Sequence, residues 1–160
     1  MDGFVIDLPA PLRWFLVNVV IIPRRKKQSA LLYKKIQSEQ GSPLLVNTRA
    51  LAVKVAKVLA GRDDRYLVEF AMRYGSPSIA SALAKLRTAD VSRIIVAPLY
   101  PQYAESSFKT AVVETERRAN ELGCGNLLQF LPPFYDRPDF IEACAARMRE
   151  CLKQDSTDHI

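Results

Sequence analysis

Three proline-bearing segments of the sequence concentrate aromatic and arginine side chains: 72–77, 98–103 and 132–135. The side chains of interest in the first two are Arg73, Tyr74, Tyr100 and Tyr103. Aromatic faces suit a flat conjugated ligand, and arginine forks suit the acid groups that such a ligand carries. Because tyrosine and proline are common in loops, one segment alone would indicate little. The three together predict a binding site for a planar, acidic molecule.

A run of basic residues, 24–27, adds to this pattern, with Lys34 and Lys35 following a short distance along the chain. The whole sequence has a formal net charge of +6. Such a run is typical of a solvated helix face, but it also suits an anionic membrane surface or a ligand with carboxylates. No RNA- or DNA-binding motif accompanies it, so we expect no nucleic-acid partner.

Residues that bind metals or perform acid–base chemistry are few. The three cysteines, Cys124, Cys144 and Cys151, form no CxxC pair and are expected to be free thiols in a reducing cytoplasm. His159 is the single histidine. The carboxylates are scattered, and we expect Glu69, Glu105 and Glu114 to be structural or solvent-facing. The sequence therefore predicts no metal site in this chain.

The elements that must position these residues alternate between strand and helix. Short apolar runs at 66–71, 93–97 and 127–131 predict strands, and the helical segments between and after them are 78–89, 107–122 and 139–153. This order predicts an α/β fold, in which a parallel sheet is covered by helices on both faces in three layers. Ligands of such sheets bind beyond the carboxyl ends of the strands, where the three aromatic segments lie.

The first 60 residues are predicted to be mostly helical, as a lip that precedes residues 61–160. Residues 11–22 are apolar but too few to cross a bilayer core of about 30 Å, so a core helix and a membrane-surface lip both remain open. Residues 28–37 have helical spacing, and a third helix is expected over 43–60, capped by Ser42. The 160 residues fit one domain.

Several motifs, read in order, resemble the ferrochelatase family. They cover nearly the whole chain: Ile6-Asp7-Leu8-Pro9, Pro11-Leu12-Arg13-Trp14, Pro23-Arg24-Arg25, Tyr33-Lys34-Lys35-Ile36, Gly41-Ser42-Pro43-Leu44, Ala71-Met72-Arg73-Tyr74-Gly75 and Pro98-Leu99-Tyr100-Pro101-Gln102-Tyr103. The resemblance implies a chelatase or flavodoxin-like half that takes part in inserting ferrous iron into a porphyrin during heme biosynthesis. It implies a cytoplasmic protein, peripheral to a membrane, whose substrates are ferrous iron and a porphyrin, with no cofactor.

The resemblance also implies roles for particular residues. Arg25, Tyr33 and Ser42 match positions that contact the porphyrin in the family, Arg24 and the pair Arg73-Tyr74 match neighbouring pocket positions, and Tyr100 and Tyr103 belong to the matching loop. The family's catalytic histidine and glutamate are expected beyond Ile160, and its first strand ahead of Met1. A strand missing from the sheet would leave exposed edges through which the chain could self-associate.

Two alternatives stay open at this stage. One is another tetrapyrrole chelatase, acting with cobalt or nickel. The other is a module without enzymatic activity that binds a porphyrin or a membrane surface.

Overall fold

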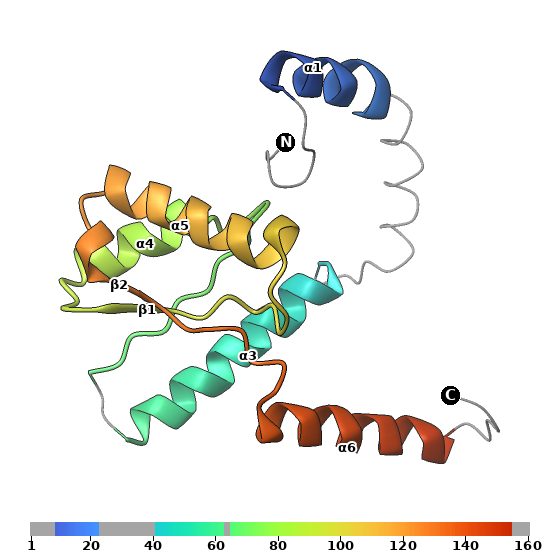
Figure 1. Cartoon of the computed structure of the whole chain (residues 1–160). Helices are drawn as coiled ribbons and strands as arrows, with labels where there is room; N and C mark the ends of the chain where they lie inside the picture. Colours follow the sequence, from blue (N-terminus) through green and yellow to red (C-terminus); the bar gives the residue numbers. More distant parts are fainter. Residues whose placement is uncertain (1–8, 23–40, 63–64, 155–160) are drawn as a thin grey trace.

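The computed structural model describes residues 9–22, 41–62 and 65–154 of the chain (Figure 1). In chain order, the elements are α1 (Ala10–Phe15), the π-helix η1 (Leu16–Ile21), α3 (Pro43–Ala60), α4 (Ile79–Thr88), β1 (Ile94–Val96), the π-helix η2 (Glu105–Lys109), α5 (Thr110–Glu121), the 3-10 helix η3 (Gly125–Leu127), β2 (Leu128–Phe130) and α6 (Pro138–Gln154). The order from α4 to α6 is the helix–strand alternation that the sequence predicts, and the fold is α/β.

The sheet of the described chain consists of β1 and β2, which run parallel. Ile94 lies opposite Leu128 and Val96 lies opposite Phe130. The strands predicted at 93–97 and 127–131 are therefore confirmed, each shortened to three residues. Since both strands point the same way, the segments that follow them leave the sheet at one edge.

The prediction of a strand at 66–71 is wrong. These residues are not bonded into a sheet, and the nearest pairing along the chain is an isolated bridge between Met72 and Ser78. Residues 68–71 are half-buried, whereas Tyr66 and Leu67 are 54% and 49% exposed, so the apolar pattern identified burial only in part. A strand also needs a neighbour, and among the described residues β1 pairs with β2 alone. Self-association through the edge of β1 that faces away from β2 stays a prediction. Light scattering on the purified chain would check it.

The core lies between α4, α5 and β1. It is built from Leu83, Ile94, Ala119 and Cys124, which are at most 4% exposed. Half-buried apolar residues surround it: Ile79, Leu86, Val91, Val96, Leu122, Leu127 and Leu128. The helices predicted at 78–89 and 107–122, which are α4 and η2 with α5, thus form a single layer that covers one face of the sheet.

Local signals explain where these helices begin and end. The Ser78 hydroxyl accepts a hydrogen bond from the backbone N–H of Ser81 at 3.1 Å, which caps α4. Gly123, with φ of +70°, ends α5 in the left-handed conformation that glycine favours. The Cys124 N–H then donates to the Ala119 carbonyl at 2.9 Å and brings the thiol into the core. All three cysteines are free thiols, as predicted, with Cys124 buried and the other two exposed.

The residues that the structure describes cover the opposite face of the sheet only in part. Figure 1 shows α4 and α5 above the two strands and α3 below them. Ile95, whose side chain belongs to this lower face, remains 52% exposed, and α3 has no buried residue. The helix predicted at 43–60 is nevertheless confirmed, since Ser42 caps it and Pro43 begins it.

The amino-terminal apolar segment is helical, as α1 and η1. The helix expected at 28–37 lies outside the described residues. Within the parts of the chain that the structure describes, every helix is too short or too polar to cross a membrane.

The three carboxylates predicted to be structural or solvent-facing all form ion pairs. Glu69 accepts from Lys85 at 3.0 Å, and Glu105 pairs with Lys109 along one helix turn. Glu114 accepts from both Arg117 and Arg118, and the hydrogen bond from Arg117 is the main cause that lowers the pKa of its carboxyl to about 2. Glu114 is therefore a charged acceptor rather than a proton carrier at neutral pH.

Candidate functional site

Two of the three aromatic segments lie together beyond the carboxyl ends of the strands. The Leu131 N–H donates to the Val96 carbonyl at 2.9 Å, directly after both strands end. The Pro101 carbonyl then accepts from the N–H groups of Phe134 and Tyr135, at 3.0 and 3.1 Å. Backbone hydrogen bonds thus fasten 98–103 to 132–135, at the edge of the sheet where they were predicted to meet.

The third segment, 72–77, is attached through Arg73. Its Nε donates to the backbone carbonyl of Thr110 at 3.1 Å, and Thr110 is 2% exposed. Thr110 begins α5 directly after η2, which follows the 98–103 loop. The Arg73 side chain of segment 72–77 therefore contacts the first residue of α5, the helix to which the 98–103 loop leads through η2. Met72 and Pro77 close the segment with a 2.8 Å hydrogen bond, and the turn between them contains Gly75 at φ +98°.

Aromatic rings extend from these loops. The Arg73 guanidinium carbon lies 4.5 Å from the centroid of the Tyr74 ring, a cation–π contact. Tyr103 packs against Phe108 with ring centroids 5.8 Å apart. Phe108 is buried, whereas Tyr74 and Tyr103 are 66% and 56% exposed. Two tyrosine rings that are held from one side thus remain accessible from the other.

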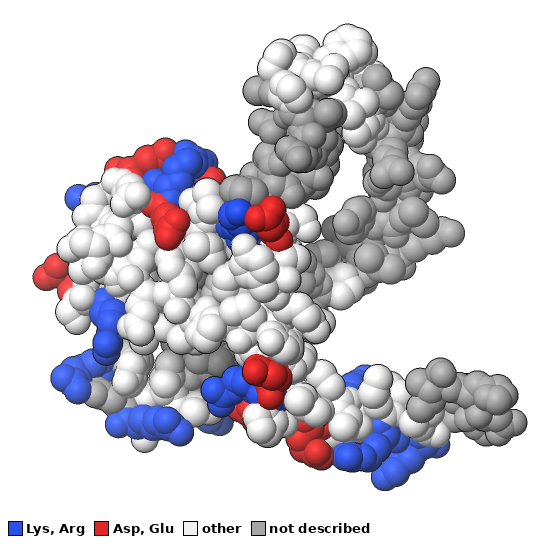
Figure 2. All heavy atoms as spheres, viewed as in Figure 1, with Lys and Arg blue, Asp and Glu red and all other residues white. Residues whose placement is uncertain are grey.

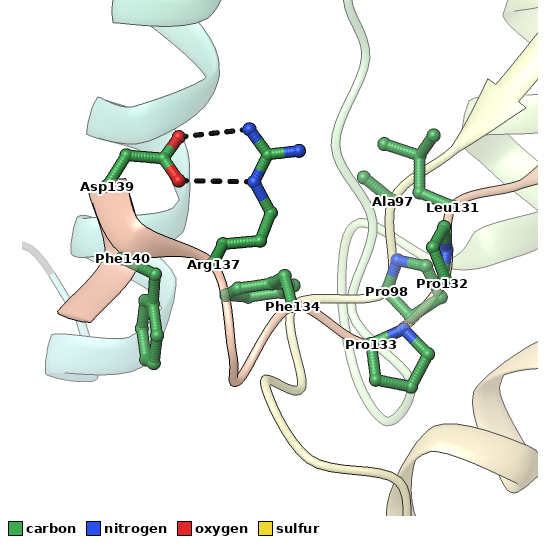
Figure 3. A pocket seen from close by; sticks show the side chains of 9 residues that line it. All are labelled: Ala97, Pro98, Leu131, Pro132, Pro133, Phe134, Arg137, Asp139 and Phe140. Carbon is green, nitrogen blue, oxygen red and sulfur yellow. Dashed lines mark hydrogen bonds and ion pairs between the residues drawn. The ribbon is translucent and has the colours of Figure 1, made fainter.

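A cavity of about 450 Å³ opens between the loops that follow β1 and β2 (Figure 3). Its lining is Ala97, Pro98, Leu131, Pro132, Pro133, Phe134, Arg137, Asp139 and Phe140. Figure 3 shows an ion pair on one side, the prolines with Ala97 and Leu131 on the other, and the Phe134 ring between them. Phe134 and Phe140 meet edge to face with centroids 5.1 Å apart. The cavity therefore combines an apolar, aromatic wall with one charged side.

The charged side is the ion pair between Arg137 and Asp139. Arg137 donates through two nitrogens to the two carboxylate oxygens, at 3.1 and 3.2 Å. This contact holds the pKa of the Asp139 carboxyl below its ordinary value and raises the pKa of Arg137. Both side chains are exposed, so an anionic ligand could compete with Asp139 for the guanidinium.

Charge is distributed unevenly around the site. Figure 2 shows that, on the face drawn, charged side chains gather over α5 and along α6, whereas the middle of the face carries none. An uncharged middle with charges at its margin suits a ligand that is apolar at its centre and acidic at its edge.

The predicted site residues have different outcomes. Arg73, Tyr74, Tyr100 and Tyr103 belong to the loops of this edge but do not line the cavity. The Ser42 hydroxyl accepts from the Leu45 N–H at 3.3 Å and so caps α3. The remaining predicted residues, Arg24, Arg25 and Tyr33, lie outside the described part of the chain. Whether these eight residues bind a porphyrin stays a prediction.

Sequence reasoning missed the residues on the charged side of the cavity. Arg137 and Asp139 flank Pro138, the first residue of α6, just after the third aromatic segment. Proline at the start of a helix with an acid in its first turn is a recognisable signal, and it could have extended the predicted site by one turn. Among the described residues, no group of three or more histidine, cysteine or acidic side chains could hold a metal ion.

Comparison with known proteins agrees with the motifs. The ferrochelatase family model matches residues 1–160. The ferrochelatase of Pseudomonas fluorescens strain Pf-5 is 44% identical over 160 residues, which are 100% of this chain and 45% of that protein. The ferrochelatase of Bdellovibrio bacteriovorus is 40% identical over 99% of this chain and 47% of its own length. The chain spans about half the length of these curated relatives, and it belongs to the ferrochelatase family as an amino-terminal half.

Proposed function

We propose that this chain supplies part of the porphyrin-binding half of an enzyme that inserts ferrous iron into a porphyrin during heme biosynthesis. Family membership supports the reaction class. The observation that carries the proposal is the carboxyl edge of the sheet, where the Arg73–Tyr74 pair and the aromatic cavity belong to loops linked by hydrogen bonds.

The chemistry of a porphyrin fits this edge. Its ring is flat, apolar and wide, so Phe134 and the neighbouring prolines can cover part of it. Its propionates are carboxylates, which an arginine can bind with two parallel hydrogen bonds. Arg73 is held against Tyr74 and fastened to the Thr110 carbonyl, so little side-chain freedom is lost when a ligand binds it.

In this proposal the described residues bind and orient the porphyrin, and the proton chemistry belongs to the other half of the family chain. Ferrous iron is a substrate, and we propose no resident cofactor. The carboxylate nearest the cavity, Asp139, is exposed and paired with Arg137, which keeps it charged. A group that accepts pyrrole protons would instead need shelter from water and a pKa near neutrality.

Replacing Arg73 with alanine is expected to weaken porphyrin binding by roughly 1.5–3 kcal/mol, the usual contribution of a charged hydrogen bond. Fluorescence titration of a porphyrin with the purified chain measures the affinity. The matched control is Arg93→Ala, because Arg93 is exposed and precedes β1, at the end of the strand away from the site. Equal affinities of the two variants would contradict a ligand role for Arg73. The same titration with Arg25→Ala tests the prediction that falls outside the described residues.

The alternatives have less support. The relatives compared above are all named ferrochelatase, and nothing in them favours a cobalt or nickel enzyme.

Contact with a membrane surface does have an observation in its favour, because the side chains of Leu12, Trp14 and Phe15 in α1 are 53%, 66% and 53% exposed. We propose that this helix lies on an anionic membrane surface, which would make the protein peripheral to a membrane on its cytoplasmic side.

Trp14 is the single tryptophan and reports on this contact directly. Vesicles containing phosphatidylserine are expected to shift its fluorescence to shorter wavelength, because the indole leaves water. Leu12→Asp should reduce vesicle affinity by about tenfold, since it places a charge on the contacting helix. Leu44→Asp, at a 66% exposed position of α3, is the control and should have no effect. An unshifted Trp14 spectrum would contradict the membrane proposal.

A further inference from the structure

The charged side of the cavity depends on one arginine whose backbone is held on both sides. The Arg137 N–H donates to the Phe134 carbonyl at 3.2 Å, and the Arg137 carbonyl accepts from the Ile141 N–H at 3.0 Å. The first contact joins Arg137 to the loop that carries the aromatic ring of the cavity, and the second joins it to the first turn of α6. The guanidinium is therefore positioned from a fixed point at the margin of the cavity.

Asp139 occupies two of the three guanidinium nitrogens. Nε of Arg137 donates to Oδ1 of Asp139 at 3.1 Å, and Nη2 donates to Oδ2 at 3.2 Å. This is the two-bond arrangement in which an arginine binds the carboxylate of a ligand. In Figure 3, the third nitrogen points away from Asp139, toward the side of the cavity on which Ala97 and Leu131 lie. Asp139 thus holds the place that a ligand carboxylate would take, next to an apolar wall.

This ion pair is one that a ligand can exchange. The side chains of Arg137 and Asp139 are 65% and 71% exposed, so water competes for the hydrogen bonds between them. Both distances, 3.1 and 3.2 Å, are longer than the roughly 2.7–2.9 Å that is usual for charged hydrogen bonds. The Asp139 carboxylate also has other donors, because the backbone N–H groups of Asp139 and Phe140 add to the effect of Arg137 in lowering its pKa. An exchange would therefore leave neither carboxylate without a donor.

We propose that Arg137 is a specificity-determining residue that binds a carboxylate of the porphyrin, and that Asp139 is an internal competitor which this carboxylate displaces. The apolar wall then selects the ring, and Arg137 selects a ring with an acid group at its margin. The inference rests on the proposed porphyrin-binding function. It adds Arg137 to Arg73 rather than replacing it, since a porphyrin carries more than one acid group. A guanidinium that is partly occupied by Asp139 lowers the apparent affinity for the ligand in proportion to the occupied fraction.

Fluorescence titration of the full chain with two probes tests this role. The probes are protoporphyrin IX, which has free propionates, and its dimethyl ester, which has none, both in the same non-ionic detergent. Asp139→Asn removes the competing charge, and Asp136→Asn is the matched control. Asp136 is exposed and its charge also acts on Arg137, whereas both side-chain hydrogen bonds that the described structure gives Arg137 go to Asp139. Arg137→Ala removes the guanidinium, and Arg137→Lys keeps the charge without the two-bond geometry.

Asp139→Asn is expected to bind protoporphyrin IX about threefold to fivefold more tightly than the unmodified chain, and Asp136→Asn to bind it within about twofold of the unmodified chain. Arg137→Ala is expected to bind it about tenfold more weakly, with Arg137→Lys in between. No substitution is expected to change the affinity for the dimethyl ester, which offers no carboxylate. All four substitutions are at exposed positions, so the circular dichroism spectra should stay unchanged.

The two probes separate this inference from the proposed function. Equal affinities of Arg137→Ala, Asp139→Asn and the unmodified chain for protoporphyrin IX would overturn the inference and leave porphyrin binding in place. The inference is also overturned if Asp136→Asn tightens binding as much as Asp139→Asn does, or if Arg137→Ala weakens binding of the ester as much as binding of the acid. An unmodified chain that binds neither probe would overturn the proposed function, and this inference with it.

Discussion

The purified chain, given ferrous or zinc ion and a porphyrin, is expected to form no metalloporphyrin above a protein-free blank. Metal insertion must remove two pyrrole protons and strip water from the ion, and both tasks need a neutral imidazole or a carboxylate in a sheltered pocket. The carboxylates Glu69, Glu105 and Glu114 are held in ion pairs. The single histidine, His159, lies outside the described residues, and the expectation that the family's catalytic histidine lies beyond Ile160 stays a prediction.

Absorbance of the metalloporphyrin measures this rate. The Pseudomonas fluorescens Pf-5 ferrochelatase, assayed under the same conditions, shows that the assay detects turnover. A mock purification from the same host controls for the host's own enzyme. Porphyrin binding in the same preparation shows that the chain is folded. Turnover clearly above the blank in a preparation free of host enzyme would contradict the assignment of binding alone to this half.

The largest expected effect on stability comes from Leu83→Ala. Leu83 is 4% exposed and contacts the core that α4, α5 and β1 share. Truncating a buried leucine loses its transfer free energy and leaves a cavity, which together cost about 2–5 kcal/mol. Since a domain of this kind is stable by only roughly 5–15 kcal/mol, this loss is a large part of the free energy of unfolding.

Urea denaturation followed by circular dichroism measures the change. Leu99→Ala is the control, because Leu99 is 49% exposed in the loop after β1 and its truncation should change stability by less than about 0.5 kcal/mol. A Leu83 variant as stable as the Leu99 variant would mean that α4 does not pack on β1 in solution.

Much of the fold follows from the sequence because its signals are local. Ser42-Pro43 and Gly61 bound α3 where predicted, and Ser78 begins α4. The prediction of a strand at 66–71 failed because strand pairing is not a local property of the sequence. An apolar run indicates burial, but pairing depends on whether another strand lies alongside, and that is a property of the tertiary structure.

The candidate site, too, could be predicted from the sequence only in part. Parallel strands bring their carboxyl ends to one edge, so the meeting of 98–103 and 132–135 could be predicted from the order of elements alone. Which side chains line the cavity depends on how the first turn of α6 is oriented. Arg137 and Phe140 line the cavity at the start of α6, whereas Tyr100 and Tyr103 are not part of its lining.

The most direct test of the porphyrin-binding role is a two-dimensional ¹H–¹⁵N NMR titration of the chain with a porphyrin. The ring current of a bound porphyrin shifts the amide signals of the residues that it covers. The largest shifts are expected in 72–75, 98–103 and 131–137, and they should saturate. The amides of Arg93 and Gly123, which precede β1 and β2 at the other end of the strands, should stay unchanged. Largest shifts at Arg93 and Gly123, or shifts that never saturate, would contradict a porphyrin site at the carboxyl edge of the sheet.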